Sequence, residues 1–265
     1  MNKIKLITMA ILLAAFSGYS ATIIDDNFDS YTIGSQPPAP WICNIANNPG
    51  VSSLTVIGSP TNTAGTGSGI EYVDNGPLGV RLEQDFSAPQ YAIRFDFSFS
   101  PLRVDGILGN YINAAVVTAG GSSGSSANRF ATLRLYDNGT ARFQAGSAPT
   151  AIGATYIPVA VGTAYKVSFF VNDSVAPVAY IDPNGGSTNV PADSVAYWMD
   201  NVYIGGGLLQ GGGTGISAGT NGLARVGFGA TTTAVGLRYA IDNVKVSQIL
   251  PPGTSGSLSL YLLGE

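Results

Sequence analysis

Strict alternation of apolar and polar side chains from Tyr91 to Ser100 is the feature that most constrains the fold. One parity is aromatic or aliphatic: Tyr91, Ile93, Phe95, Phe97 and Phe99. The other parity is small or polar and includes Arg94 and Asp96. A strand with this pattern has one face in a hydrophobic core and the other in water. No segment after the first 20 residues shows sustained helical periodicity.

The rest of the chain repeats the strand pattern. Further strands are expected at 22–28, 54–57, 70–73, 80–86, 112–118, 133–136, 142–145, 165–171, 178–181, 195–204, 224–228 and 239–246. Asp137-Asn138-Gly139-Thr140 predicts a tight hairpin turn, since Asn-Gly accepts positive φ. Gly205 to Gly222 is expected to be a glycine-rich surface loop. About a dozen strands without helices predict an all-β, two-sheet antiparallel β-sandwich, a jelly roll or a close relative.

The last expected strand changes parity in its middle. Tyr239 and Ile241 share one parity, whereas Val244 and Val246 share the other. A regular strand keeps its apolar side chains on one parity, so the change predicts a β-bulge at Asp242-Asn243. An acidic residue at a bulge is a candidate metal ligand or structural anchor.

The first residues have the layout of a secretory signal peptide. Lys3 and Lys5 precede an apolar run at 6–16, which is too short to span a bilayer comfortably. We expect cleavage after Ser20, with Ala21 the alternative and an uncleaved anchor the competing interpretation. The predicted organisation is a signal peptide at 1–20, one β-sandwich domain at 21–249 and a short C-terminal tail at 250–265. The protein is expected to be secreted or in the cell envelope, with no transmembrane span in the mature chain.

Composition excludes several functional classes. The chain has no histidine, which removes the usual general base, the serine-hydrolase triad and histidine metal sites. Cys43 is the only cysteine, so no intramolecular disulfide forms, and a buried small apolar role is expected for it. The formal net charge is −4 and charged residues make up 11% of the chain. No run of basic residues is present, so nucleic acid is not an expected partner.

Three segments together resemble a known family. Phe28-Asp29-Ser30-Tyr31 with Gly34 lies near the start, Ile241-Asp242-Asn243-Val244 lies near the end, and Tyr165-Lys166-Val167-Ser168-Phe169 lies between them. The set resembles the concanavalin A-like, laminin-G-like jelly rolls of secreted bacterial proteins. Many of these open with a "Phe, acid, Ser, Tyr, two residues, Gly" pattern and close on "Ile-Asp-Asn-Val". The resemblance covers essentially the whole mature chain and indicates fold more than function.

The resemblance also implies a structural calcium ion that ties the first strand to the last. Asp242 would bind it, helped by Asp26 or Asp29 of the first segment. Calcium prefers six to eight oxygen ligands, and backbone carbonyls can complete such a shell. The competing interpretation is that Asp242 and Asn243 only hydrogen-bond the turn or the neighbouring strand.

Noncatalytic carbohydrate binding is the function expected first. Sugars stack on aromatic rings while amides and carboxylates hold their hydroxyls. Tyr197, Trp198 and Tyr203 supply rings in what reads as one strand beside the glycine-rich loop. Tyr197 and Trp198 point to opposite faces of such a strand, so each ring is either a binding or a core residue. The expected partner is therefore a polysaccharide or another glycan.

Two other functions remain open. A polysaccharide-degrading enzyme is one, but Glu71, Glu83 and Glu265 are the only glutamates and none forms a paired-carboxylate motif. A lyase using Tyr136 with Arg134 or Arg142 is an alternative to reading these residues as the solvated face of a hairpin. A structural or adhesive surface protein is the other, because the tail faintly resembles the sorting tails of secreted proteins.

Overall fold

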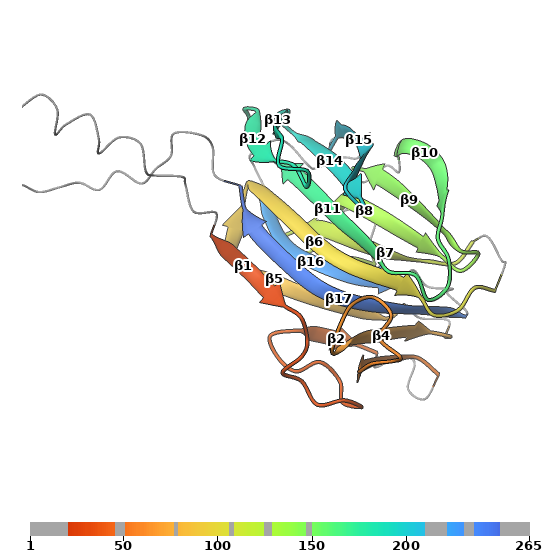
Figure 1. Ribbon diagram of the computed structural model, residues 1–265. Coiled ribbons are helices and arrows are strands. Elements are labelled where there is room, and N and C mark those ends of the chain that lie inside the picture. Colours follow the sequence, from red (N-terminus) through yellow and green to blue (C-terminus); the bar gives the residue numbers. More distant parts are fainter. Residues whose placement is uncertain are drawn as a thin grey trace, which may run out of the picture.

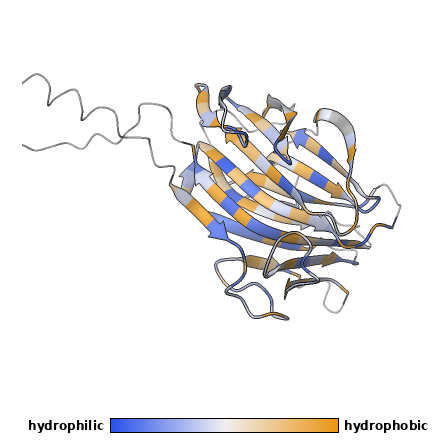
Figure 2. Ribbon diagram, in the orientation of Figure 1, coloured by the Kyte–Doolittle hydropathy of each residue, from blue (hydrophilic) through white to orange (hydrophobic). Residues whose placement is uncertain are grey.

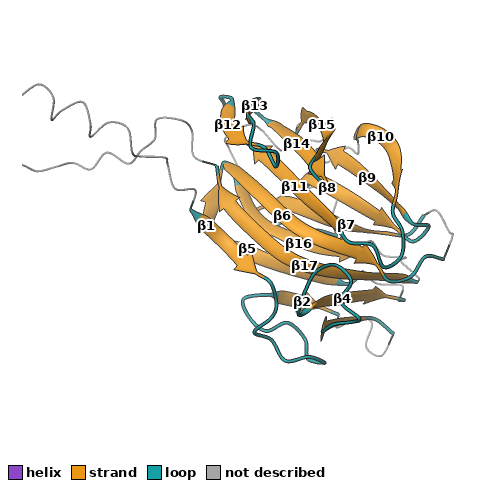
Figure 3. Ribbon diagram, in the orientation of Figure 1, coloured by secondary structure: helices purple, strands orange, loops and turns teal. Residues whose placement is uncertain are grey.

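The described part of the computed structural model is built from strands joined by loops (Figure 3). The structure describes residues 21–45, 51–76, 79–105, 109–124, 129–146, 150–209, 222–230 and 236–249, with residues 154 and 155 described by their backbone alone. Within these ranges no helix is long and apolar enough to cross a membrane. The predicted signal peptide at 1–20 and the predicted tail at 250–265 lie outside the described residues. The described strands belong to the domain predicted between them.

One layer is an eight-stranded sheet (Figure 1). Its order is β15-β14-β11-β6-β17-β4-β3, and β1 pairs with the second half of β17. The strands are β1 (Thr22–Asp26), β3 (Ser53–Ile57), β4 (Gly69–Asp74), β6 (Ala92–Pro101), β11 (Tyr165–Asn172), β14 (Ser194–Met199), β15 (Val202–Leu208) and β17 (Leu237–Gln248). The first and last described strands therefore lie side by side.

The second layer is a seven-stranded sheet in the order β10-β9-β8-β7-β16-β5-β2. Its strands are β2 (Ile42–Asn44), β5 (Arg81–Gln90), β7 (Tyr111–Thr118), β8 (Arg129–Tyr136), β9 (Thr140–Ala145), β10 (Thr150–Pro158) and β16 (Leu223–Ala230). A separate hairpin is formed by β12 (Val178–Ile181) and β13 (Ser187–Val190). Every strand pairing is antiparallel, so the predicted two-sheet antiparallel sandwich is confirmed.

The core lies between the two sheets and is rich in aromatic rings. Apolar and polar residues alternate along the strands, so that each sheet turns one apolar face inward (Figure 2). Phe97 of β6 meets Phe169 of β11 edge-on at 5.8 Å and Phe228 of β16 at 5.2 Å. Each such buried ring stabilises the fold by roughly 1.5–3 kcal/mol relative to exposure. Ile93, Phe95, Phe97 and Phe99 form the core face that the alternation predicts, whereas the opposite face is only partly wet, because Arg94 and Asp96 are half-buried and Ser98 and Ser100 are buried.

The segment 195–204, expected to be one strand, is a hairpin. β14 ends at Met199, which pairs with Val202 of β15. Asp200 and Asn201 form the two-residue turn with φ of 49° and 63°. Turns with two positive φ angles match the twist of antiparallel strands, and Asp and Asn tolerate them. The expected glycine loop is also shorter, because Gly205, Gly206 and Gly207 belong to β15, and residues 210–221 lie outside the described residues.

The predicted bulge in β17 is confirmed. Its register against β6 shifts between Asp242 and Lys245, and Asn243 has a φ of 53°. As a result Tyr239, Ile241, Val244 and Val246 all reach the core. The predicted turn at Asp137–Thr140 is present as well, with Gly139 at a φ of 75° between β8 and β9. The strands β2, β10 and β13 are additions that the sequence pattern did not predict.

Candidate functional site

Asp26, one of the predicted calcium ligands, anchors the segment that follows β1. Its Oδ2 accepts the Tyr31 hydroxyl at 2.6 Å and Trp41 Nε1 at 2.7 Å, and its Oδ1 accepts the Phe28 backbone N–H at 2.8 Å. Phe28 packs between the Tyr31 and Trp41 rings and has a φ of 60°. Three donors occupy this carboxylate, so Asp26 holds a turn together and fits a metal poorly.

Asp29 and Asp242 lie under the loop that joins β3 to β4. Asp29 Oδ1 accepts the Ser68 backbone N–H, and Asp242 Oδ2 accepts Asn62 Nδ2 at 2.9 Å. A Cβ added to Gly65 would overlap the Asp242 carboxylate, and one added to Gly67 would overlap that of Asp29. The glycines therefore let the loop backbone approach both acids. The segment after β1, the β17 bulge and this loop therefore meet at one place.

Asp26, Asp29 and Asp242 bring negative charge to this region, and no described cationic side chain forms an ion pair with them. Burial raises the pKa of Asp242 to about 6 against hydrogen bonds from Asn62 and Asn243, and the charges of Asp29 and Asp26 add to the rise. None of the ion pairs between described residues includes these three acids. A hard cation would relieve the repulsion, and Asp29 and Asp242 each offer oxygen atoms for it.

The metal-ligand set of the described residues is small, however. Nowhere in the described ranges do three or more His, Cys, Asp or Glu side chains gather so that they could hold a metal. A calcium ion here would rest on Asp29 and Asp242 together with amide or carbonyl oxygens of the neighbouring loop. That donor set fits calcium, which accepts neutral oxygens readily. It would not satisfy zinc, which selects nitrogen and sulfur ligands.

Tyr197, one of the three predicted ligand-binding rings, faces the core. It is 0% exposed, meets Phe143 and Phe169 at 4.9 Å each, and donates its hydroxyl to the Gln144 carbonyl at 2.5 Å. The Tyr197 hydroxyl also accepts the Thr132 backbone N–H, so it links the two sheets. No surface of this ring is left for a ligand, and Tyr197 is a core residue.

Trp198 and Tyr203, the other two predicted rings, lie together on the outer face of the eight-stranded sheet. They are cross-strand partners in the β14–β15 hairpin, with ring centroids 5.2 Å apart. Trp198 is only 8% exposed, whereas Tyr203 is 53% exposed. The exposed Tyr203 ring therefore packs against the buried indole of Trp198.

The β12–β13 hairpin covers the neighbouring part of this face. Tyr180 of β12 stacks on Phe170 of β11 at 3.9 Å, and Trp198 Nε1 donates to the Tyr180 hydroxyl at 3.2 Å. Burial raises the pKa of Tyr180, against the hydrogen bond from Trp198, so the phenol stays protonated. Its O–H remains available to donate. The two hairpins are joined by this aromatic contact.

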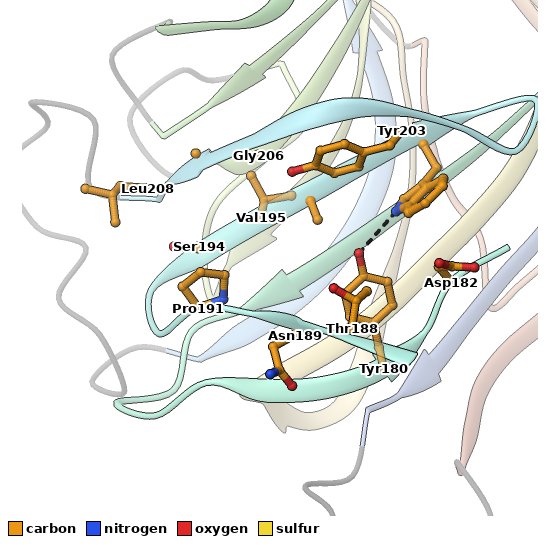
Figure 4. A pocket seen from close by; sticks show the side chains of 13 residues that line it. Tyr180, Asp182, Thr188, Asn189, Pro191, Ser194, Val195, Tyr203, Gly206 and Leu208 are labelled. Atoms are coloured by element: carbon orange, nitrogen blue, oxygen red, sulfur yellow. Dashed lines mark hydrogen bonds between the residues drawn. The ribbon is translucent and has the colours of Figure 1, made fainter. Parts of the chain in front are cut away.

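A groove of about 620 Å³ lies between the two hairpins (Figure 4). Its lining is Tyr180, Asp182, Thr188, Asn189, Pro191, Ser194, Val195, Ala196, Trp198, Tyr203, Gly206, Gly207 and Leu208. The polar side chains at its rim are those of Asp182, Thr188 and Asn189, which Figure 4 shows on the β12–β13 side opposite Tyr203. Asp182 Oδ1 accepts the backbone N–H groups of Asn184 and Gly186, which leaves Oδ2 able to accept from a ligand.

Glycine in β15 sets the depth of the groove. A Cβ on Gly206 would lie 2.8 Å from the Val195 carbonyl oxygen and 3.1 Å from the Tyr203 hydroxyl. Gly206 therefore lets the Tyr203 side chain lie along its own strand. The sequence pattern found Trp198 and Tyr203 but missed Tyr180, Asp182 and Gly206. Only the turn chemistry of Asp200-Asn201 could have indicated that the two strands fold back on each other.

The two sheets, their order and their shared aromatic core form a concanavalin A-like β-sandwich, which confirms the fold that the sequence resemblance implied. Solved structures with this fold superpose over most of the chain. The globular domain of T. cruzi calreticulin has a TM-score of 0.52 at 10% identity, covering 87% of this chain and 89% of that one. No protein-family model and no curated protein sequence matches the chain.

Two carbohydrate recognition domains superpose similarly. A mutant of the Emp46p domain has a TM-score of 0.52 at 10% identity, covering 85% of this chain and 94% of its own. The Emp47p domain has a TM-score of 0.50 at 13% identity, covering 86% and 95%. Identities this low establish a shared fold, and the fold is one that carbohydrate recognition domains use.

Proposed function

We propose that the protein is a noncatalytic carbohydrate-binding β-sandwich that binds a glycan in the groove between the β14–β15 and β12–β13 hairpins. The observation that carries the proposal is the half-exposed Tyr203 ring held against Trp198 at 5.2 Å, opposite polar side chains. Sugar rings have apolar faces that stack on such aromatics, while their hydroxyls need donors and acceptors at the edge. The β14–β15 hairpin supplies the rings and the separate β12–β13 hairpin supplies the polar edge.

The polar groups of the groove suit hydroxyl recognition. Asp182 Oδ2 and the Asn189 amide oxygen accept hydrogen bonds, whereas the Tyr180 O–H and the Asn189 amide N–H donate them. Each sugar hydroxyl both donates and accepts, so a mixed rim matches it better than a rim of one kind. The shared fold with the Emp46p and Emp47p carbohydrate recognition domains is consistent with this use.

The groove supports binding better than hydrolysis. Among its lining residues Asp182 is the one acid. Glycoside hydrolysis by the usual mechanism needs two carboxyl groups, about 5–5.5 Å apart for retention or ~6.5–9.5 Å for inversion. Asp182 also holds a turn by accepting hydrogen bonds from two backbone N–H groups. A glycan would therefore be bound and released unchanged.

A structural calcium ion is a second part of the proposal. It would be held by Asp29 and Asp242, where like charges meet without a cationic side chain. Bound there, the ion would neutralise the two carboxylates and tie the β17 bulge to the segment after β1. Its effect would be on stability, since the groove lies on other strands of the sheet.

The place of action is proposed to be outside the cell or at the cell surface. Support comes from the amino-terminal pattern of Lys3, Lys5 and a short apolar run, and from a single half-buried cysteine, Cys43. Polysaccharides are the abundant partners of such an environment. An adhesive role on a surface would use the same groove.

The test is a glycan array probed with the purified protein, once with calcium and once with chelator. The proposal predicts binding to a restricted set of glycans, and unchanged glycans after long incubation. Release of shortened or unsaturated products would indicate an enzyme instead. An array without any bound glycan under either condition would contradict carbohydrate binding.

A further inference from the structure

The outer face of the seven-stranded sheet carries a second set of polar side chains, far from the groove in strand order. Antiparallel pairing places Asn113 of β7 beside Arg134 of β8, and Arg134 beside Arg142 of β9. One pair further along, Thr132 lies beside Gln144. Their neighbours of opposite parity, such as Leu133 and Phe143, point into the core. We name Arg129, Arg134, Arg142, Gln144 and Asn113 the arginine face.

Buried atoms of the arginine face lack hydrogen-bond partners. Arg129 is 4% exposed, Gln144 is 2% exposed and Asn113 is 0% exposed. Arg129 Nη1, Arg134 Nε, Arg142 Nε and Gln144 Nε2 are buried donors with no partner, and Asn113 Oδ1 is a buried acceptor with none. Leaving a buried polar group unpaired is costly, so such groups rarely gather by chance. These four donors and one acceptor have no hydrogen-bond partner in the part of the chain that the structure describes.

The charge of the arginine face is equally unbalanced. In a chain with a net charge of −4, none of the ion pairs between described residues includes Arg129, Arg134 or Arg142. The acids on the same face, Glu83 and Asp85, are already bound to Arg225. Asp137, in the turn after β8, accepts Asn110 Nδ2. Burial, together with the nearby charge of Arg134, lowers the pKa of Arg129 to about 10.

Tyrosine rings hold the guanidinium groups in place. Arg134 lies 4.2 Å from the Tyr111 ring centroid, and Arg142 lies 5.5 Å from that of Tyr156. Tyr136 contacts both rings, at 5.2 Å from Tyr111 and 5.5 Å from Tyr156. Cation–π contacts of this kind fix the planes of the guanidinium groups without neutralising them. The positive charge therefore stays available on a preorganised surface.

We infer that the arginine face is a binding site for an acidic saccharide, with the half-buried Arg134 and Arg142 holding its carboxylate or sulfate groups. Guanidinium groups bind such anions through paired hydrogen bonds. Arg134 and Arg142 are cross-strand partners, so neighbouring acidic groups of one saccharide chain can reach both. The buried Arg129 adds positive charge near Arg134 without contacting the ligand.

A nucleic acid is the competing polyanion, and it fits less well. Nucleic acid binding to single strands needs open aromatic faces for the bases. Of the three tyrosines here only Tyr156 is more than one-third exposed, at 37%.

The test is titration calorimetry of the full chain with oligogalacturonate, oligomannuronate and hyaluronan oligosaccharides. The carboxyl-reduced form of each is the neutral control, and sodium sulfate and a thymidine oligonucleotide are the competing anions. Arg134→Gln and Arg142→Gln are the test variants. Lys166→Gln is the matched control, because it removes the same charge from an exposed position on the other sheet. Tyr203→Ala separates this site from the groove.

We expect at least one acidic oligosaccharide to bind, its reduced form not to bind, and each arginine variant to lose at least tenfold in affinity. Lys166→Gln should bind as the unaltered protein does. Both arginine variants should keep the melting temperature or raise it, because like charges no longer repel. Four results would overturn the inference: no acidic oligosaccharide binds, only sulfate or the oligonucleotide binds, the arginine variants lose binding and stability together, or Tyr203→Ala alone loses binding, which would place the saccharide in the groove.

Discussion

Trp198 and Tyr203 face each other across a two-residue turn, with ring centroids 5.2 Å apart and exposures of 8% and 53%. The turn at Asp200-Asn201 is what brings them together. Trp198 is fixed from below by the hydrogen bond to Tyr180. The buried indole thus positions an exposed phenol at the edge of a groove. This division between a structural ring and a binding ring underlies the proposed function.

Gly206→Ala should disturb the groove without touching its polar rim. The added Cβ would lie 2.8 Å from the Val195 carbonyl oxygen and 3.1 Å from the Tyr203 hydroxyl, so both must move. We expect a loss of about 1–3 kcal/mol in the free energy of unfolding, as for other overpacked sites, together with weaker glycan binding. Urea unfolding and calorimetric titration measure the two effects. Unaltered binding by a folded variant would show that the position of Tyr203 is not important.

Asp26→Asn should destabilise the segment after β1. The carboxylate accepts hydrogen bonds from Phe28, Tyr31 and Trp41, and the amide presents a donor where these groups need an acceptor. A loss of about 1–3 kcal/mol in the free energy of unfolding is expected. Asp25→Asn is the matched control, because Asp25 is exposed and its ion pair with Lys245 is a surface pair. Equal unfolding midpoints in urea for the two variants would refute an anchoring role.

Calcium should raise the melting temperature through Asp29 and Asp242. An ion at 100 times its dissociation constant adds about 2.7 kcal/mol, which corresponds to roughly 5–10 °C for a domain of this size. Asp242→Asn should remove this response, whereas Asp26→Asn and Asp25→Asn should retain it. Melting curves with calcium and with chelator decide the matter. A midpoint that is the same in both conditions would eliminate the ion.

Cys43 should react slowly with alkylating agents at neutral pH. Burial raises the pKa of its thiol to about 11, and only the thiolate is a good nucleophile. A raised pKa favours the protonated form, so the alkylation rate should climb steadily from pH 7 until the pH approaches 11. Iodoacetamide labelling followed by mass spectrometry measures the rate at each pH. A rate that levels off near pH 8.5, as for a free thiol, would contradict the burial of Cys43.

The sequence carried most of the fold because alternation reports directly on burial. Most of the segment from Tyr91 to Ser100 forms β6, with Phe95, Phe97 and Phe99 in the core, although Tyr91 itself lies before the strand and is exposed. The change of parity around Asp242 corresponds to a bulge. The misreading of 195–204 as one strand has a clear cause. Asp200-Asn201 interrupts an otherwise apolar segment, and its turn preference was overlooked in favour of the flanking pattern.

The sites were harder to predict because they depend on strand order. Tyr180 reaches Trp198 only because the β12–β13 hairpin folds over β11 and β14. The arginine face joins the predicted β8–β9 hairpin to β7, and no local pattern specifies the pairing of β7 with β8. The resemblance to a known family implied Asp26, Asp29 and Asp242 as calcium ligands. Their hydrogen bonds in the structure separate Asp26, which anchors a turn, from Asp29 and Asp242, which remain candidate ligands.

The most direct measurement of the central claim is the affinity of Tyr203→Ala for a glycan selected on the array. Loss of the stacking ring should cost about 1–2 kcal/mol in binding, or roughly 5- to 30-fold in the dissociation constant, with little change in melting temperature. Tyr91→Ala is the control, because Tyr91 is 48% exposed and is not among the residues that line the groove. The account predicts weaker binding for Tyr203→Ala alone; equal affinities for both variants and the unaltered protein would contradict it.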